Sequence, residues 1–177
     1  PKIDYVAVQT YNGYTGEKMT VVLAKALLYT HFNKKAEELA LEDYKPGDKL
    51  IPFKVVGEYK GPDLVGMEYE QLIPWVKPVT VDENGKWQEA AGEAFRVIPG
   101  DYVTTEDGTG IVHIAPTFGA DDAFVARAAG IPSLFMINKK GETRPMVDLT
   151  GKFYLLDELD EAFVKECVDV EKYKEYQ

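Results

Sequence analysis

One histidine and two adjacent carboxylates lie close together in the sequence, and proteins use side chains of these types for proton transfer and charge binding. His113 precedes an Ile-Ala pair and a Pro-Thr-Phe-Gly loop, and Asp121 and Asp122 follow after one alanine. We expect a strand to end at the histidine and a helix to begin at the aspartates. Such a junction can aim side chains and backbone amides into a cleft.

A purely structural role accounts for the same three residues. Asp121 would then cap the predicted helix, Asp122 would complement the helix dipole, and His113 would be a core side chain with satisfied hydrogen bonds. Spacing alone leaves both interpretations open.

The strands that would position these residues are predicted from β-prone runs bounded by Gly, Pro and Asn. Two further runs, residues 133–137 and 143–147, flank an Asn-Lys-Lys-Gly turn and predict a hairpin. Residues 74–92 predict a long irregular or hairpin-like insertion. The other expected strands are residues 1–9, 19–23, 53–59, 95–98, 101–105 and 111–115, the last three forming a β-meander.

Helices are expected at three places and are fewer than the strands. Residues 24–32 contain strong helix formers, with a helical extension over residues 34–41. The helix from about Ala120 has acids in its first turn and ends at Gly130, both favourable placements. The tail, residues 155–176, is charged and helical in composition.

Strands and helices do not alternate regularly, which predicts an α+β fold class rather than a doubly wound nucleotide-binding fold. We expect one domain over residues 1–177, with a barrel-like, mostly antiparallel β sheet and peripheral helices. The first methionine is Met19, and the chain is therefore expected to be an excised piece of a longer protein.

Composition narrows the function classes. The formal net charge of −10 argues against binding nucleic acid through the average field, so an RNA partner would need a local patch. The single cysteine, Cys167, cannot form an internal disulfide, and a cytoplasmic location is expected. We expect no membrane association and no metal site. Phosphate-binding loops and dinucleotide fingerprints are absent from the sequence, so ATP chemistry within this chain is not expected.

A family resemblance goes further. Residues 108–116 read Gly-Thr-Gly-Ile-Val-His-Ile-Ala-Pro, and residues 118–122 read Phe-Gly-Ala-Asp-Asp. This pattern closely resembles the editing domain, or connective peptide, inserted into isoleucyl-tRNA synthetases of class I. Residues 1–6 and 61–69 resemble further segments of that domain, so the resemblance covers essentially the whole chain. The family's threonine-rich peptide, one wall of its editing pocket, is missing.

The resemblance implies a function: ester hydrolysis of valyl-tRNA(Ile) by an aminoacyl-tRNA deacylase domain in a double-sieve mechanism. Asp122 is expected to hold the α-ammonium group of the substrate, and His113 to border the side-chain pocket and help to position water. Val112, Ala115 and Phe118 would bind substrate as pocket-wall or supporting residues. Asp121 is a further substrate-binding candidate, although capping suits it better.

The resemblance also implies partners, which would be the 3′ end of tRNA(Ile) and the rest of the parent synthetase. That parent uses ATP and Mg, whereas this domain needs no cofactor. Valyl and leucyl enzymes have similar editing domains, but His113 and the Phe118-Gly119 loop favour the isoleucyl enzyme. The sequence is also compatible with a truncated fold that binds without hydrolysing and with a generic acidic interaction domain.

Overall fold

The computed structural model describes residues 2–90 and 94–175. The chain divides into two compact units, which are described one at a time. Unit 1 consists of Pro1–Gly66 and Val97–His113, and unit 2 of Met67–Arg96 and Ile114–Gln177. The expectation of a single functional domain over residues 1–177 stays a prediction.

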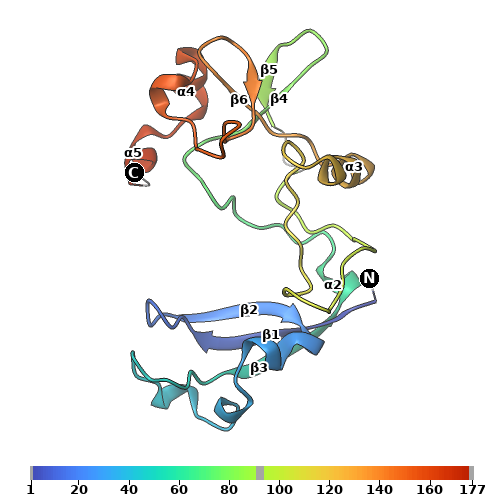
Figure 1. Ribbon diagram of the computed structural model, residues 1–177, viewed down its shortest axis with the longest axis vertical. Coiled ribbons are helices and arrows are strands. Elements are labelled where there is room, and N and C mark those ends of the chain that lie inside the picture. Colours follow the sequence, from blue (N-terminus) through green and yellow to red (C-terminus); the bar gives the residue numbers. More distant parts are fainter. Residues whose placement is uncertain (1, 91–93, 176–177) are drawn as a thin grey trace. The chain divides into compact units, whose positions relative to one another are not determined.

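Unit 1 is built on a three-stranded antiparallel sheet with the order β2-β1-β3 (Figure 1). Its strands are β1 (Asp4–Tyr11), β2 (Lys18–Ala24) and β3 (Lys54–Lys60), which confirms the three predicted strands in these regions. The β1–β2 turn is fixed by the Asn12 side chain, which accepts hydrogen bonds from the amides of residues 14 and 15. Gly16 supplies the positive φ, 75°, that closes the turn.

The central strand β1 is buried on both faces because side chains alternate across the sheet. Val6 and Val8 lie on one face, within a cluster that includes Phe53. Tyr5 lies in a second cluster with Ala24, Leu27 and Leu64. A one-residue slip of register would exchange the two sets, so this pattern specifies the pairing strongly.

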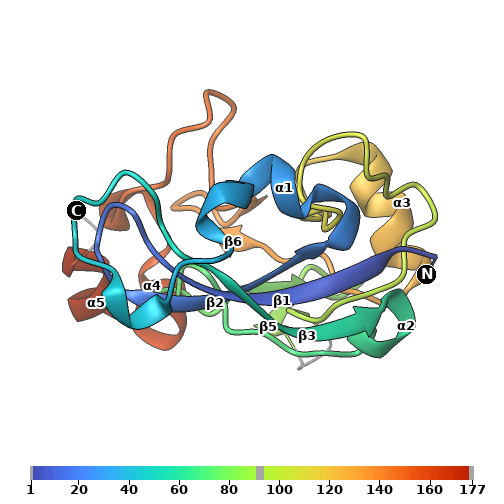
Figure 2. The ribbon, with the colours of Figure 1, turned by 90° about the horizontal axis from the view of Figure 1, so that it is seen from below.

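A short helical segment follows β2, as predicted. It consists of a 3₁₀ turn (Lys25–Leu27) and α1 (Leu28–His31), which is labelled in Figure 2. Leu28 packs into the cluster of Val6 and Val8. The predicted helical extension over residues 34–41 is wrong in part. Two separate 3₁₀ turns, Lys34–Ala36 and Leu41–Asp43, replace it. The side chain of Asn33 accepts the Lys35 amide hydrogen and caps the first of these turns, which therefore begins separately from α1.

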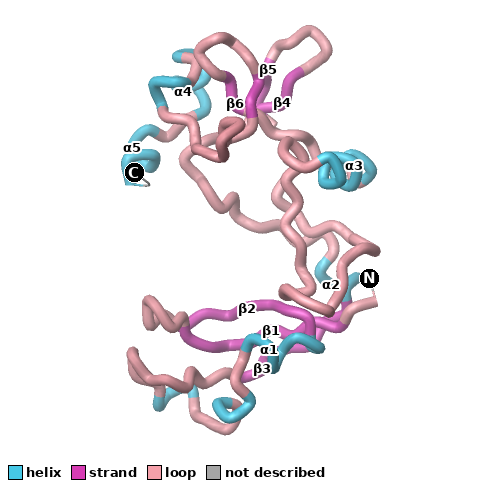
Figure 3. Tube along the Cα trace, viewed as in Figure 1, coloured by secondary structure: helices cyan, strands magenta, loops and turns pink. Residues whose placement is uncertain are grey.

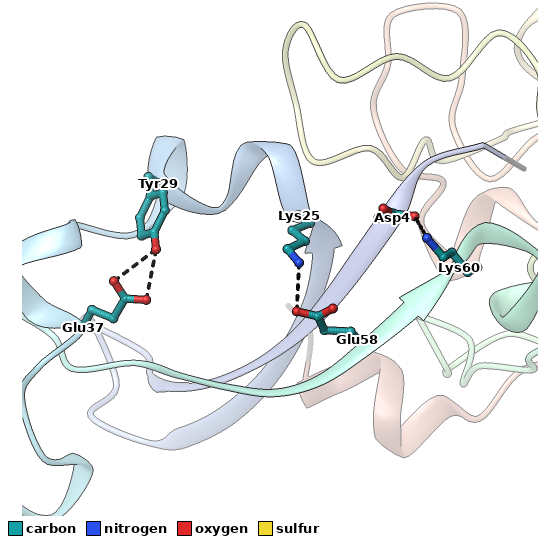
Figure 4. A network of polar contacts seen from close by, with 6 residues as sticks. All are labelled: Asp4, Lys25, Tyr29, Glu37, Glu58 and Lys60. Carbon is teal, nitrogen blue, oxygen red and sulfur yellow. Dashed lines mark hydrogen bonds and ion pairs between the residues drawn. The ribbon is translucent and has the colours of Figure 1, made fainter.

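Exposed polar contacts tie β3 to the rest of unit 1 (Figure 4). Lys60 Nζ lies 2.7 Å from Asp4 Oδ1 on β1, and Lys25 Nζ lies 2.9 Å from Glu58 Oε1 on β3. The hydrogen bond to Asp4 raises the pKa of Lys60. The short helix α2 (Gly61–Leu64) follows β3 directly, where the sequence predicted only the end of a strand.

Unit 2 contains two small hairpins. One pairs β4 (Val79–Val81) with β5 (Trp87–Glu89), which confirms a hairpin within the predicted insertion, of which residues 91 and 92 lie outside the described residues. The other pairs β6 (Met136–Ile137) with β7 (Thr143–Arg144), so this predicted hairpin is confirmed with shorter strands. Val79 and Phe135 exchange backbone hydrogen bonds of 3.0 and 2.8 Å, which join the hairpins.

The described helices of unit 2 are α3 (Ala120–Ala128), α4 (Glu161–Cys167) and α5 (Val170–Glu175), so α3 is confirmed and the predicted helical tail is interrupted at Val168. α4 and α5 contribute side chains to the core. The core is a cluster of nine buried residues: Trp75, Val76, Val79, Met136, Ile137, Leu159, Phe163, Cys167 and Tyr173.

The predicted barrel is not found in the described part of the chain. Its strands form one three-stranded and two two-stranded sheets, consistent with an α+β fragment. Strands of two or three residues offer too few ladder hydrogen bonds to continue a sheet around a closed cylinder. No described helix is long and apolar enough to cross a membrane.

Candidate functional site

The predicted β-meander is wrong, and with it the strand that was to end at His113. Residues 97–113 form turns and loop, coloured pink in Figure 3. Gly108 and Gly110 have φ values of 64° and 76°, in the left-handed region. Both glycines lie in the connection predicted before residues 111–115. Those residues form no strand, although they have high β propensity.

The Gly-Thr-Gly loop, residues 108–110, is held through all three of its carbonyl groups. The His31 ring nitrogen Nε2 lies 2.6 Å from the Gly108 oxygen. The Ala24 amide donates to Thr109 O at 2.8 Å, and the buried Tyr5 hydroxyl donates to Gly110 O at 2.7 Å. The loop is therefore fixed to unit 1 from α1, from the end of β2 and from β1.

His113 and Val112 follow this anchored loop, and both side chains are exposed. The interpretation of His113 as a core residue is therefore wrong. His31 lies in the last turn of α1, where a positive charge would complement the helix dipole. Its contact with the Gly108 carbonyl bridges 77 positions of sequence, so no local pattern indicates it.

A second candidate region is the loop before α3 in unit 2. The amides of Phe118 and Gly119 both donate to Ala115 O, at 2.9 and 3.1 Å. The Ala115 amide donates in turn to Asp122 Oδ2 at 3.0 Å. These bonds close a compact turn that holds the Asp122 carboxylate in the first turn of α3, where the helix dipole favours negative charge.

The structure distinguishes between the two aspartates. Gly119 occupies the N-cap position of α3, so the predicted capping role of Asp121 is wrong. Asp121 is exposed in the first turn, whereas Asp122 is half-buried and bonded to the loop. Phe118 is 65% exposed and Ala115 half-buried. The loop thus brings Ala115, Phe118 and Asp122 together, while Val112 and His113 belong to unit 1.

Unit 1 also contains a cavity that sequence patterns did not indicate. Its volume is about 490 Å³, within the range of small-molecule pockets. Its lining includes Met19 and Val21 of β2, Leu50 and Ile51 of the segment before β3, His31 of α1 and Thr109 of the Gly-Thr-Gly loop. Separately, no three or more His, Cys, Asp or Glu side chains among the described residues gather in a way that could hold a metal ion.

Comparison with known proteins gives no match to a family model. The isoleucine-tRNA ligase of Bacteroides thetaiotaomicron is 85% identical over 177 residues, which is 100% of this chain and 15% of that protein. The enzymes of Bacteroides fragilis and Porphyromonas gingivalis are 75% and 53% identical, each match covering 99% of this chain. The chain thus spans 14–15% of the length of these curated relatives, and the similarity supports a fragment of an isoleucine-tRNA ligase.

Proposed function

We propose that this chain is the editing part of an isoleucine-tRNA ligase and that it hydrolyses the ester joining mischarged valine to tRNA(Ile). Similarity along the whole chain to segments of these ligases supports the parent protein. The observation that carries the activity is the Asp122 carboxylate, held at the start of α3 by the amide of Ala115.

Asp122 is suited to hold the α-ammonium group of a valyl ester. Its Oδ2 atom accepts the Ala115 amide hydrogen, and its Oδ1 atom makes no hydrogen bond within the described part of the chain. A carboxylate offers about four acceptor positions, so an ammonium group can bind without displacing the loop. The charge-assisted hydrogen bond then fixes the position of the ester carbonyl relative to the attacking water.

The reaction is hydrolysis by a positioned water molecule. The water oxygen forms a bond to the ester carbonyl carbon, and the bond from that carbon to the ribose oxygen breaks. The proton that the attacking water loses reaches the ribose oxygen with assistance from the neighbouring ribose hydroxyl, leaving valine and a tRNA with a free 3′ end. This step requires neither a covalent intermediate on the protein nor a metal ion.

Editing compensates for weak discrimination between isoleucine and valine when the amino acid is activated. Isoleucine-tRNA ligases are the standard example, because one methylene in an apolar pocket contributes only about 1–3 kcal/mol of selectivity. A second site that admits valine and excludes isoleucine multiplies that selectivity. We assign the exclusion of isoleucine to His113, with Val112 and Phe118 as candidate wall residues, and the ATP and Mg chemistry to the rest of the parent enzyme.

The proposed function is tested with the full-length ligase and purified tRNA(Ile) charged with valine or isoleucine. We expect valyl-tRNA(Ile) to be hydrolysed much faster than its spontaneous rate and isoleucyl-tRNA(Ile) to be spared. Valyl-tRNA(Ile) that decays no faster with the enzyme than without it would exclude the proposal. Threonyl-tRNA(Val) hydrolysed in preference would indicate the valyl type of editing domain instead.

Replacing His113 by alanine is expected to relax the size limit, because the imidazole ring would no longer exclude the extra methylene of isoleucine. Hydrolysis of isoleucyl-tRNA(Ile) should rise about tenfold or more, within the selectivity that one methylene provides. Hydrolysis of valyl-tRNA(Ile) by the same variant is the internal control and should continue. A His113→Ala enzyme that still spares isoleucyl-tRNA(Ile) would remove His113 from the sieve.

The proposed reaction would need two partners, the tRNA and the rest of the ligase. The tRNA 3′ end carrying a noncognate amino acid would be the substrate, the remaining domains of the ligase would hold the tRNA body, and the reaction would take place in the cytoplasm. The net charge of −10 fits this division, because a chain so acidic is expected to bind tRNA poorly by itself.

A further inference from the structure

Gly119 lies directly beside the carboxylate of Asp122. A Cβ atom at position 119 would lie 3.0 Å from Asp122 Oδ2 and 3.1 Å from its Cγ atom. The backbone of Gly119 has φ −103° and ψ 134°, an extended conformation that any residue can adopt. The backbone therefore does not require glycine here, and the relevant property of Gly119 is the space that its missing side chain leaves.

Two hydrogen bonds surround this space and join residues 115, 119 and 122. The Gly119 amide donates to Ala115 O at 3.1 Å, and the Ala115 amide donates to Asp122 Oδ2 at 3.0 Å. The carboxylate thus folds back over residue 119 to reach the loop. Its position, and hence the direction of the Oδ1 atom, depends on how closely it can approach the Gly119 backbone.

We propose that Gly119 is a positioning residue for hydrolysis, because the lack of a side chain there sets the orientation of the Asp122 carboxylate. This inference rests on the proposed function, in which that carboxylate holds the substrate ammonium group. A methyl group at residue 119 would displace the carboxylate by a few tenths of an ångström and lengthen its bond to the Ala115 amide. The ester would then be held out of line with the attacking water.

The test compares the full-length wild-type ligase with its Gly119→Ala variant in hydrolysis of purified valyl-tRNA(Ile). We expect kcat for hydrolysis to fall about tenfold, since misplacement of reacting groups by about 1 Å costs about a hundredfold. KM should change less than kcat, and isoleucylation should be unchanged. A Gly119→Ala enzyme with the wild-type kcat would overturn the inference.

A matched control is available at Gly13 in unit 1. A Cβ atom there would also have a neighbour at 3.0 Å, but that neighbour is Ile51 Cδ1, the end of a flexible apolar side chain. Gly13→Ala therefore introduces the same methyl group against a similar close contact, and it should leave hydrolysis unchanged. An equal loss in Gly13→Ala would mean that the effect at Gly119 is not specific to the carboxylate.

A double-mutant cycle separates positioning from a merely structural role. In an Asp122→Ala background no carboxylate meets the new methyl group, so Gly119→Ala should cause no further loss of the residual enzymatic rate. Fully additive losses would overturn the inference. If the wild-type enzyme does not hydrolyse valyl-tRNA(Ile), the proposed function itself fails. If the wild type is active and Gly119→Ala equals it, only the positioning role fails.

Discussion

The full-length ligase with Asp122 replaced by alanine is expected to hydrolyse valyl-tRNA(Ile) at least about a hundredfold more slowly than the wild type. A hydrogen bond to a charged partner contributes about 1.5–3 kcal/mol, which is about ten- to a hundredfold in rate. The substitution also removes the 3.0 Å bond that holds the Ala115 amide, so the loop before α3 loses its anchor as well. Hydrolysis of purified valyl-tRNA(Ile) measures the first effect, and continued isoleucylation shows that the remaining enzyme is intact.

Asparagine at the same position distinguishes the two effects. Asp122→Asn keeps a side-chain oxygen that can accept the Ala115 amide hydrogen, but it removes the negative charge that would bind the ammonium group. We therefore expect this variant to lose at least about tenfold in hydrolysis while retaining the loop. An Asp122→Asn enzyme as active as the wild type would leave Asp122 with a structural role only.

Asp157→Ala is the charge control for this experiment. Asp157 is an exposed carboxylate of unit 2 in the 3₁₀ turn Leu156–Glu158, so its removal changes the net charge by the same amount. Hydrolysis by Asp157→Ala should match the wild type. Equal losses in Asp157→Ala and Asp122→Ala would attribute the effect to net charge rather than to a specific contact.

Replacing Gly110 by alanine is expected to destabilise unit 1 by about 2–5 kcal/mol. A left-handed backbone costs a residue with a side chain about 1–2 kcal/mol, and φ at Gly110 is 76°. Overpacking typically adds about 1–3 kcal/mol, because the new Cβ atom would lie 2.6 Å from the Cβ atom of fully buried Ala24. Ala24 is paired with Tyr5 in the sheet, so it has little freedom to move away.

Gly108 provides the control for that substitution. Its φ is 64°, and a Cβ atom there would have no neighbour within 4 Å. Gly108→Ala should therefore show the backbone cost alone, about 1–2 kcal/mol. Chemical denaturation of both variants measures the difference, and equal destabilisation would mean that the close approach to Ala24 is relieved without cost.

Local sequence patterns predicted the elements that local interactions determine. The predicted strands β1 and β2 flank a turn closed by Asn12 and Gly16, and α3 has acids in its first turn and Gly130 with φ 70° after its last. In each case the residues that decide the structure lie within a few positions of one another. These predictions were therefore accurate to within a few residues.

The missed features depend on contacts between distant residues. The β propensity of residues 111–115 was real, but the loop before them is bonded to Tyr5, Ala24 and His31, and the Tyr5 contact spans 105 positions. No short window of sequence contains both partners. The hydrogen bond between the Ala115 amide and Asp122 is local, so distance along the chain does not explain why it was missed. Both aspartates suit a helix start equally well by composition, and the capping role was therefore wrongly predicted for Asp121.

The outer edge of β3 bears on the solubility of unit 1. β3 is an edge strand of its sheet, and Val55, Val56 and Tyr59 on it are 40–53% exposed, a surface on which a second chain could add a strand. Lys54 and Lys60 begin and end this strand. An antiparallel second copy paired over the full length of β3 would set the first lysine of one chain opposite the last lysine of the other, and like charges directly opposite destabilise such a pair. The two lysines therefore weaken self-association of the protein through this apolar strand edge, but by less than two free charges would, because Lys60 is already paired with Asp4.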